Sequence, residues 1–302
     1  MPSSEKACFE ITTYNAYALF DSYDDGTEFD GFRRSDGYDG EAYRKRIREL
    51  AVLLGRSYSD SDVIILQEVE SIEVLSDLLT AGLKDKGYVH YGLADDGNGS
   101  LFVGFISKLK PLSSALHSYP GCRPILELSF GIGDEVVKVF GVHFRSRIED
   151  SDTERMEQAR HLSMLIEDNP DTLCIAAGDF NSDPLLSGPF TIFPELYDPS
   201  NAFHLTGDPS KTAERIYYSP LLDPDAVPEE QGTYFYEGSW YSYDNVFLTG
   251  ECWDGSGLEY ESAKIKATRN MKDSMDRPLK YDTSTGLGYS DHFPITLRLG
   301  TK

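Results

Sequence analysis

The clearest chemical signal in the sequence is Gly178-Asp179-Phe180-Asn181, which directly follows the apolar run 172–177. An acid and an amide two residues apart at the carboxyl end of a strand can both point into a crevice, and ligands of α/β sheets bind at such places. A carboxylate and an amide oxygen suit a hard cation or an attacking water. The same four residues are also compatible with a simple turn, in which the Asp179 side chain binds nearby backbone.

Five further motifs place polar or ionisable residues beside predicted strands. Taken singly, most have an ordinary explanation as a solvated strand end, a turn or a structural histidine. Asp244 is different, because a charge at the edge of an apolar strand is costly unless it is paired. Together, the six sites carry the residue types that phosphoryl hydrolysis needs, and packing alone does not explain them. The five motifs are Thr13-Tyr14-Asn15, Gln67-Glu68, Gly141-Val142-His143-Phe144-Arg145-Ser146, Tyr243-Asp244-Asn245 and Ser290-Asp291-His292.

The elements that must position these residues can be read from the hydrophobic pattern. Short apolar runs bounded by polar or glycine-containing segments predict strands, and their continuous apolar character predicts sheets that are covered on both faces. Helical periodicity over 43–54, 72–84 and 153–166 predicts helices, the first with Arg44, Lys45, Arg46 and Arg48 mostly off its apolar face. The predicted strands are 8–14, 63–66, 101–107, 125–130, 136–142, 172–177, 242–248 and 294–299.

One long stretch, 183–238, is rich in proline and tyrosine and lacks these patterns. It is too long to be an idle connection in a compact domain. We therefore predict an elaborated surface region that carries substrate contacts. Because the chain contains no internal repeat and no Pro/Ser-rich linker, we predict a single domain over residues 1–302.

The composition excludes several classes of protein. A net charge of −23 argues against tight, sequence-specific binding of duplex DNA, which needs several Lys or Arg on phosphates. It does not exclude a nuclease whose bound metal supplies positive charge locally. The 4 cysteines form no CxxC pair, so a zinc knuckle is excluded. We expect no membrane span, because no run approaches the ~20 apolar residues required. We find no secretion signal at the N-terminus, and the compartment stays open.

In this order, the motifs resemble those of the endonuclease/exonuclease/phosphatase superfamily, which has the deoxyribonuclease I-like fold. The resemblance extends from Thr13-Tyr14-Asn15 to Ser290-Asp291-His292 and covers nearly the whole chain. It implies an α/β fold, a four-layer α/β/β/α sandwich in which two central mixed sheets pack face to face. The helices would lie outside, and the site would lie at one rim of the sheets.

The resemblance also implies a cation site. Glu68 is similar to the principal metal carboxylate of the family, with Asn15 and Asp291 nearby as direct or water-mediated ligands. Oxygen-rich ligands favour Mg²⁺ or Mn²⁺ over zinc.

The remaining motif residues resemble the family's water and phosphate groups. Asp179 is similar to the residue that orients or deprotonates the attacking water, and Asn181 to its partner on the water or a phosphate oxygen. His292 is similar to the histidine that contacts the scissile phosphate, and Asp244 to the acid that favours its protonated form. His143 is similar to a second histidine on the phosphate side.

Together these features predict a metal-dependent hydrolase of phosphate esters, foremost a phosphodiesterase or endonuclease-like enzyme that uses an activated water. No covalent nucleophile is required, so we expect direct attack by water. One alternative is a phosphomonoesterase that acts on a small phosphorylated molecule, such as an inositol phosphate or a nucleotide. Another is a non-catalytic binding module of the same fold. Nucleic acid is one candidate substrate, and no obligate protein partner is evident.

Three secondary features carry alternatives that stay open. Arg123 and Arg145, together with Arg147, are candidates for phosphate contacts or for ordinary surface ion pairs. The acidic segment 21–28 fails the calcium-loop pattern and is predicted to be a solvated loop near the active rim. The aromatic cluster from Tyr234 to Tyr243 could stack bases or hold a lipid headgroup, although packing around Asp244 is the simpler interpretation.

Overall fold

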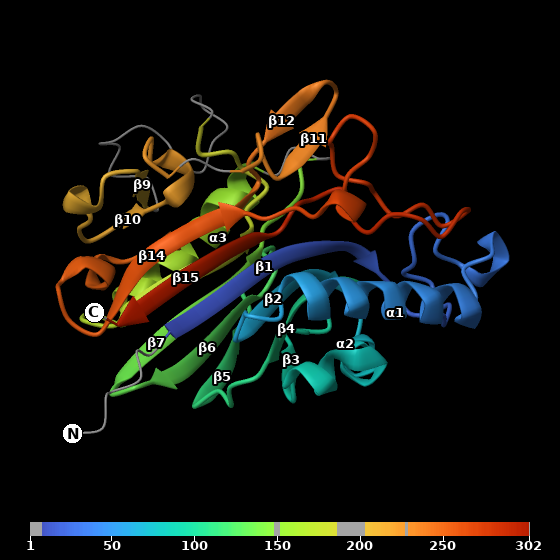
Figure 1. Cartoon of the computed structure of the whole chain (residues 1–302), viewed down its shortest axis with the longest axis horizontal. Helices are drawn as coiled ribbons and strands as arrows, with labels where there is room; N and C mark the ends of the chain where they lie inside the picture. The colour runs from blue at the N-terminus through green and yellow to red at the C-terminus, as the bar shows by residue number, and fades with distance from the viewer. Residues whose placement is uncertain (1–7, 148–151, 186–202, 227–228, 302) are drawn as a thin grey trace.

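The computed structural model describes residues 8–147, 152–185, 203–226 and 229–301. Over these ranges the chain forms two large mixed sheets that face each other, with helices on the outside (Figure 1). The predicted α/β/β/α sandwich is confirmed. No helix in the described ranges is long and apolar enough to cross a membrane.

The first sheet has six strands in the order β14-β15-β1-β2-β4-β3. The central strand β1 pairs in parallel with β2, and its register sets Asn15 opposite Gln67. This pairing brings the polar ends of two predicted strands to the same edge of the sheet. The strands are β1 (Cys8–Leu19), β2 (Val63–Val69), β3 (His90–Leu93), β4 (Phe102–Ser107), β14 (Leu258–Ile265) and β15 (Ile295–Thr301).

The second sheet has seven strands in the order β5-β6-β7-β8-β13-β10-β9. Its centre is β8, which runs parallel to β7 and antiparallel to β13. A separate hairpin is formed by β11 (Tyr234–Tyr236) and β12 (Ser239–Tyr241). The other strands are β5 (Ser113–His117), β6 (Ile125–Ile132), β7 (Glu135–His143), β8 (Leu173–Asp179), β9 (His204–Thr206), β10 (Ile216–Tyr218) and β13 (Asp244–Leu248).

Helices cover the outer faces of both sheets. α1 (Gly40–Ser57) begins at Asp39, whose side chain accepts hydrogen bonds from two first-turn N–H groups, and α2 (Ile72–Leu78) begins at Ser71. α2 lies against β2, β3 and β4 of the first sheet and also contacts α1. α3 (Asp152–Glu167) packs its apolar side on the outer face of the second sheet. Each sheet is therefore covered on both faces, as the apolar strand runs predict.

The core between the sheets joins strands that are far apart in the sequence. Phe9 of β1 and Phe130 of β6 contact each other with ring centroids 5.7 Å apart. Ile175 and Ala177 of β8 belong to the same buried cluster as Ile11 and Phe9. This continuous packing fixes the separation of the two sheets, and with it the separation of polar groups at their shared rim.

All eight predicted strands and all three predicted helices are present, with ends that differ by a few residues. The predicted helix 72–84 is shorter than expected: its α-helical part ends at Leu78, and the next turn contains Gly82 with φ 141°. β3, β5 and β14 were not predicted, because these strands lie at sheet edges and lack a continuous apolar run. The stretch 183–238 contains β9, β10 and β11, and its residues 186–202 lie outside the described ranges.

The placement of Arg46 differs from the prediction. The helical pattern set it mostly away from the apolar face of the first helix, but its side chain is buried, with 4% of its surface exposed. Its guanidinium reaches backbone carbonyls of residues 16–18, which the periodicity of a single helix cannot reveal.

Candidate active site

Three of the predicted site residues form a row across the second sheet. Asp179 of β8 pairs with His143 of β7 on one side and with Asp244 of β13 on the other. Side chains that are directly opposite in a sheet point to the same face, so the three groups converge. All are buried, with 3% of His143, 1% of Asp179 and none of Asp244 exposed. Strand register alone therefore brings together residues that are 101 positions apart, from 143 to 244.

The backbone around Asp179 holds its carboxylate in place. The Asn181 N–H donates to Asp179 Oδ1 (2.8 Å), and Asn181 itself has φ 47°. The Asn181 side-chain amide donates to the Phe144 carbonyl (3.0 Å). Immediately before Asp179, a Cβ on Gly178 would lie 2.0 Å from the Val142 carbonyl oxygen, so only glycine fits this close approach to β7.

The first sheet contributes Asn15 and Glu68. The Asn15 amide nitrogen donates to Glu68 Oε1 (3.1 Å) and to Asp179 Oδ2 (3.0 Å), which links the two sheets at their rim. Glu68 Oε2 accepts the Ala18 N–H (2.6 Å). The Asn15 amide oxygen accepts the Tyr17 N–H (3.0 Å). Asn15, expected as a cation ligand, therefore turns its oxygen to the backbone and uses its nitrogen to hold two carboxylates.

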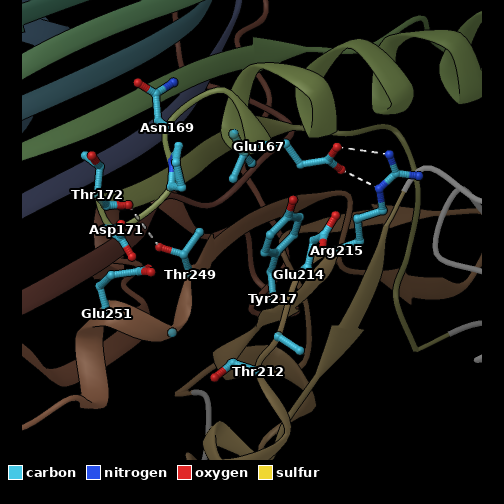
Figure 2. A pocket seen from close by; sticks show the side chains of 14 residues that line it. Glu167, Asn169, Asp171, Thr172, Thr212, Glu214, Arg215, Tyr217, Thr249 and Glu251 are labelled. Carbon is cyan, nitrogen blue, oxygen red and sulfur yellow. Dashed lines mark hydrogen bonds and ion pairs between the residues drawn. The ribbon is translucent and has the colours of Figure 1, made fainter.

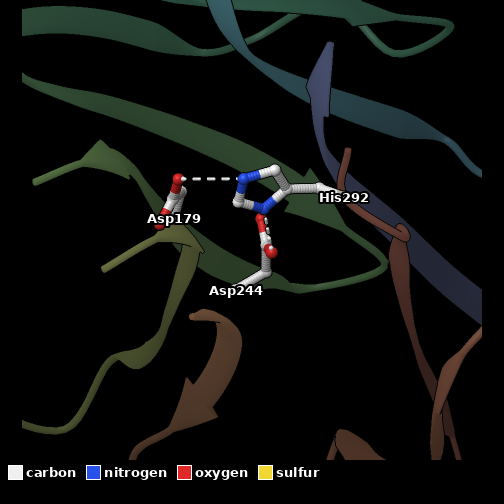
Figure 3. A group of neighbouring side chains, drawn as sticks. All are labelled: Asp179, Asp244 and His292. Carbon is white, nitrogen blue, oxygen red and sulfur yellow. Dashed lines mark hydrogen bonds and ion pairs between the residues drawn. The ribbon is translucent and has the colours of Figure 1, made fainter. Parts of the chain in front are cut away.

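Among the described site residues, His292 and Asp244 form the closest charged pair (Figure 3). Their Nδ1 and Oδ2 atoms are 2.7 Å apart, and both side chains are buried. Burial lowers the pKa of His292, but the charge and hydrogen bond of Asp244, followed by the Asp179 charge, outweigh it and raise the pKa to about 10. Ser290 fixes the turn, because its Oγ donates to the Asn15 carbonyl (2.7 Å) and accepts the His292 N–H (3.0 Å).

His143 has the opposite character. Burial lowers its pKa well below the ordinary value of 6.5, and the charges of Arg123 and His292 lower it further. Its Nε2 lies 3.7 Å from Asp179 Oδ2 and 3.9 Å from Glu68 Oε1, and its buried Nδ1 has no hydrogen-bond partner among the described residues. The site thus contains one cationic and one neutral imidazole at neutral pH.

Asp179 lies between these two histidines. Burial is the largest cause that raises its pKa, and the Asp244 charge raises it further. The His292 charge and the N–H donors of Asn181 and Asn15 oppose this effect, and the resulting pKa is about 7. A carboxylate with a pKa near neutrality is suited to take a proton from water.

The oxygen atoms around Glu68 fit a hard cation. Asp291 lies beside His292, with its Oδ1 3.9 Å from His292 Nε2, and Asp179, Glu68 and Asn15 are connected as described. Glu68 and Asp179 are thus joined through Asn15, and Asp291 lies next to the His292 ring; carboxylate oxygens of this kind are the ligands that Mg²⁺ or Mn²⁺ prefers. Asp179, Asp244 and His292 also bring ligand atoms within 4.8 Å of one another. His292 is held cationic by Asp244, however, and a protonated imidazole has no lone pair for a metal.

Lys280 is a site residue that the sequence did not indicate. Its ammonium lies 3.3 Å from Asp291 Oδ2 and 4.1 Å from the centroid of the Tyr17 ring. The residue comes from the irregular segment before Asp291, where no motif or periodicity marks it. It places a cation at the outer edge of the carboxylate cluster.

The predicted arginines take different positions. Arg123 donates to the Phe144 carbonyl (3.3 Å). Burial lowers the pKa of Arg123, and the nearby charges of Glu68 and Asp179 oppose that effect. Because these two carboxylates act on it, Arg123 lies on the side of the site. Arg145 is exposed, and its backbone N–H donates to Gln158. The Arg147 guanidinium reaches the Asn181 carbonyl at 3.5 Å. Of the three, Arg123 is best placed for a phosphate at Asp179.

The aromatic cluster forms a stacked series beside His292. The Tyr234 ring lies 4.7 Å from the His292 ring and stacks on Tyr243 at 5.3 Å. Tyr241 stacks on Tyr243 (5.1 Å), and Tyr236 extends the series from Tyr234 (6.2 Å). Tyr236 is 53% exposed, so the series leads from the buried histidine to the surface.

Most of the acidic segment 21–28 is solvated, with residues 23–27 exposed, but its last residue is not. Glu28 is buried, and its carboxylate accepts the N–H groups of Asp25 and Gly26. Glu70 accepts the Asp21 N–H (2.5 Å) and lies within 4.8 Å of Asp25 and Glu28. Burial raises the pKa of Glu70 to about 8, and the charges of its acidic neighbours add to this effect.

A cavity of 440 Å³ lies away from these groups (Figure 2). It is lined by Thr172, Glu167 and Arg215, among others, and the Arg215 guanidinium pairs with the Glu167 carboxylate. Thr172 immediately precedes β8, whereas Asp179 ends it, and seven residues of strand span roughly 20 Å. This cavity is therefore separate from the candidate active site.

Comparison with known proteins places the chain in a family. The sequence profile of the Endonuclease/Exonuclease/phosphatase family matches residues 10–301. The chain belongs to this family. No match was found among the curated proteins.

Solved structures of the Endonuclease/Exonuclease/phosphatase fold are similar over almost the whole chain. TDP2 from D. rerio, crystallised with a single-strand DNA product, has 18% identity and a TM-score of 0.59, and the match covers 97% of this chain and 99% of that one. A family protein from Bacteroides thetaiotaomicron has 17% identity and a TM-score of 0.59 over 99% of both chains. A mannosyl-6-phosphatase from the same organism has 17% identity and a TM-score of 0.57 over 96% of this chain and 99% of that one. At these identities the similarity establishes the fold alone.

Proposed function

We propose that the protein is a hydrolase of phosphate esters that activates water directly, with Mg²⁺ or Mn²⁺ as its cation. One observation carries the proposal. Asp244 holds His292 in its cationic form beside Asp179, and Asn15 connects Asp179 to Glu68 on the other sheet. In this proposal Asp179 is the base, His292 the cationic donor and Glu68 part of the cation site, which are the groups that water attack on a phosphate requires.

Asp179 is proposed as the base. The oxygen of water attacks phosphorus, and Asp179 accepts the water proton as the new P–O bond forms. The bond from phosphorus to the leaving oxygen breaks, and that oxygen departs with the bonding electron pair and is protonated by solvent. Asn181 lies directly beside Asp179 and is proposed to orient the water.

His292, His143 and Arg123 are proposed to stabilise negative charge on the phosphate. His292 donates from Nε2, since Nδ1 is engaged by Asp244. His143 is neutral and can donate one N–H without adding a second imidazolium to the site. Donors that are held in place before the reaction are worth more than mobile ones, because they need no reorganisation as charge develops.

Glu68 and Asp291 are proposed to hold the cation, with Asn15 positioning Glu68 and Asp179 through its amide nitrogen. When bound, such a cation supplies electrostatic stabilisation to phosphate oxygens and lowers the pKa of coordinated water.

We propose a phosphodiester with an aromatic or nucleoside group as the substrate class. The stacked series from Tyr234 to Tyr236 offers a π-face next to the phosphate position, and base–aromatic stacking is worth about 1–3 kcal/mol per base. The net charge of −23 disfavours a long duplex, so short single strands and nucleotide esters fit better. The TDP2 relative with a single-strand DNA product is consistent with this choice.

The test compares hydrolysis of bis-p-nitrophenyl phosphate and p-nitrophenyl phosphate with Mg²⁺, with Mn²⁺ and with EDTA. We expect turnover of the diester that EDTA abolishes, and a loss of about 10²-fold or more in Asp179→Asn and His292→Asn. Asp168→Asn and His90→Gln, which lie outside the site, serve as controls and should retain activity. Preference for the monoester would support a phosphomonoesterase instead. No turnover of any phosphate ester would leave the binding-module alternative.

A further inference from the structure

The cation site rests on a backbone turn that has an unusual conformation. Tyr17 and Ala18 are both in the left-handed region, with φ 52° and 43°, and Glu68 has φ 63°. Non-glycine residues populate this region sparsely and remain there only when their surroundings hold them. The turn matters because the Ala18 N–H donates to Glu68 Oε2 (2.6 Å) and the Tyr17 N–H donates to Asn15 Oδ1 (3.0 Å).

Arg46 of α1 holds this turn from the opposite side. Its guanidinium donates to the carbonyls of Ala18 (2.8 Å), Ala16 (3.1 Å) and Tyr17. Three successive carbonyls therefore point to one cation, while the N–H groups of the same turn point to the site carboxylate and amide. The planar guanidinium offers several donors in a fixed fork, which a lysine ammonium does not.

Aromatic rings keep the guanidinium in position. It lies 4.2 Å from the centroid of the Tyr281 ring and 5.3 Å from that of Phe32. Tyr281 directly follows Lys280, whose ammonium contacts Asp291 and the Tyr17 ring. Arg46 thus contacts the turn behind Glu68 and also the segment that delivers Lys280 to the edge of the site.

We propose that Arg46 is a positioning residue that sets the affinity of the site for its divalent cation. It acts through the turn 16–18, which fixes the Glu68 carboxylate and the Asn15 amide in the orientation that the cation requires. This inference rests on the proposed function, because it assumes that Glu68 is a cation ligand. Groups that orient a metal ligand from behind typically change metal affinity by about 10–100-fold when they are removed.

The experiment measures Mn²⁺ binding to EDTA-treated protein by electron paramagnetic resonance, without substrate. Arg46→Met should weaken Mn²⁺ binding by about tenfold or more. Arg46→Lys should weaken it less, by about threefold, because the charge remains without the fork. In turnover, the Mn²⁺ concentration at half-maximal rate should rise in both variants, while the rate at saturating Mn²⁺ recovers towards the native value.

Two control variants on the same helix separate positioning from general loosening. Arg48 is exposed, so Arg48→Met removes a charge without touching the turn. Leu50 is buried, so Leu50→Ala lowers the unfolding temperature while the Arg46 contacts stay intact. Both should bind Mn²⁺ as the native protein does. If Arg46→Met does not fold, Arg46→Lys provides the same comparison.

The outcomes are distinct. Native Mn²⁺ affinity in both Arg46 variants, or an equal loss in Leu50→Ala, would overturn the role of Arg46 and leave the proposed function standing. If the native protein itself binds no Mn²⁺, the cation site is wrong, and the inference fails with it.

Discussion

Replacing Asp244 by asparagine isolates the pair on which the proposed chemistry depends. The change keeps the size of the side chain and removes its charge, 2.7 Å from His292 Nδ1. In the native protein the pKa of His292 is raised from 6.5 to about 10 against the effect of burial, and Asp244 is the largest favourable cause. This raised pKa favours the cationic form by on the order of 5 kcal/mol. Without Asp244, burial should dominate and return the pKa to the ordinary histidine range or below.

The consequence for protonation is large at slightly alkaline pH. At pH 8, a pKa near 10 leaves about 99% of His292 protonated, whereas a pKa of 7 or less leaves under about 10%. We expect kcat/KM at pH 8 to fall by about 10²-fold or more, since orientation of the ring is lost together with its charge. The alkaline limb of the pH profile should move to lower pH. The same raised pKa stabilises the native fold fully below pH 6.5, and this contribution is lost as the pH rises through about 10.

The assay is an NMR titration of the histidine side chains in metal-free protein, paired with rate measurements on bis-p-nitrophenyl phosphate between pH 5 and 10. Asp223→Asn, which removes the carboxylate that accepts the Tyr218 hydroxyl (2.7 Å) away from the site, serves as the control. If His292 in Asp244→Asn still titrates near 10, or if the rate profile is unchanged, our account of the pair is wrong.

Three further predictions concern other parts of the molecule. Gly178→Ala should destabilise the protein by about 3 kcal/mol in urea unfolding, because its Cβ would lie 2.0 Å from the Val142 carbonyl oxygen; native stability would contradict the close approach. Burial raises the pKa of Glu70 from 4.5 to about 8, so this group favours the fold when protonated, and native stability should fall between pH 4.5 and 8. Glu70→Gln should therefore unfold at a higher temperature than the native protein at pH 8 and at the same temperature at pH 4; an equal difference at both pH values would refute this. The Lys280 ammonium lies 3.3 Å from Asp291, so Lys280→Met should raise KM for an anionic substrate more than it lowers kcat. An unchanged KM would exclude a contact between this ammonium and the substrate.

The sequence was sufficient for the buried inner strands of the two sheets and for the residues that end them, but not for the strands at the sheet edges. Runs such as 63–66 and 172–177 are apolar throughout, because both faces of their sheets are buried, and they end in Glu68 and Asp179. The sequence could not give the orientation of the Asn15 side-chain amide. That orientation is set by the Tyr17 N–H, which donates to the Asn15 amide oxygen. The sequence also missed Arg46 and Lys280, whose partners are backbone carbonyls and a distant carboxylate rather than neighbours in a motif. That residues 1–302 form a single domain stays a prediction.

The hydrogen bond from Asn15 to Asp179 joins side chains that belong to different sheets. The proposed reacting groups are therefore divided between two sheets. The thickness of the apolar layer between the sheets sets the distance between these groups. The rings of Phe9 and Phe130 contact each other in this apolar layer. A smaller side chain at either position would let the two sheets move closer together or shift relative to each other. Substitutions deep in this layer are therefore expected to change the spacing of Asn15 and Asp179 without altering either side chain.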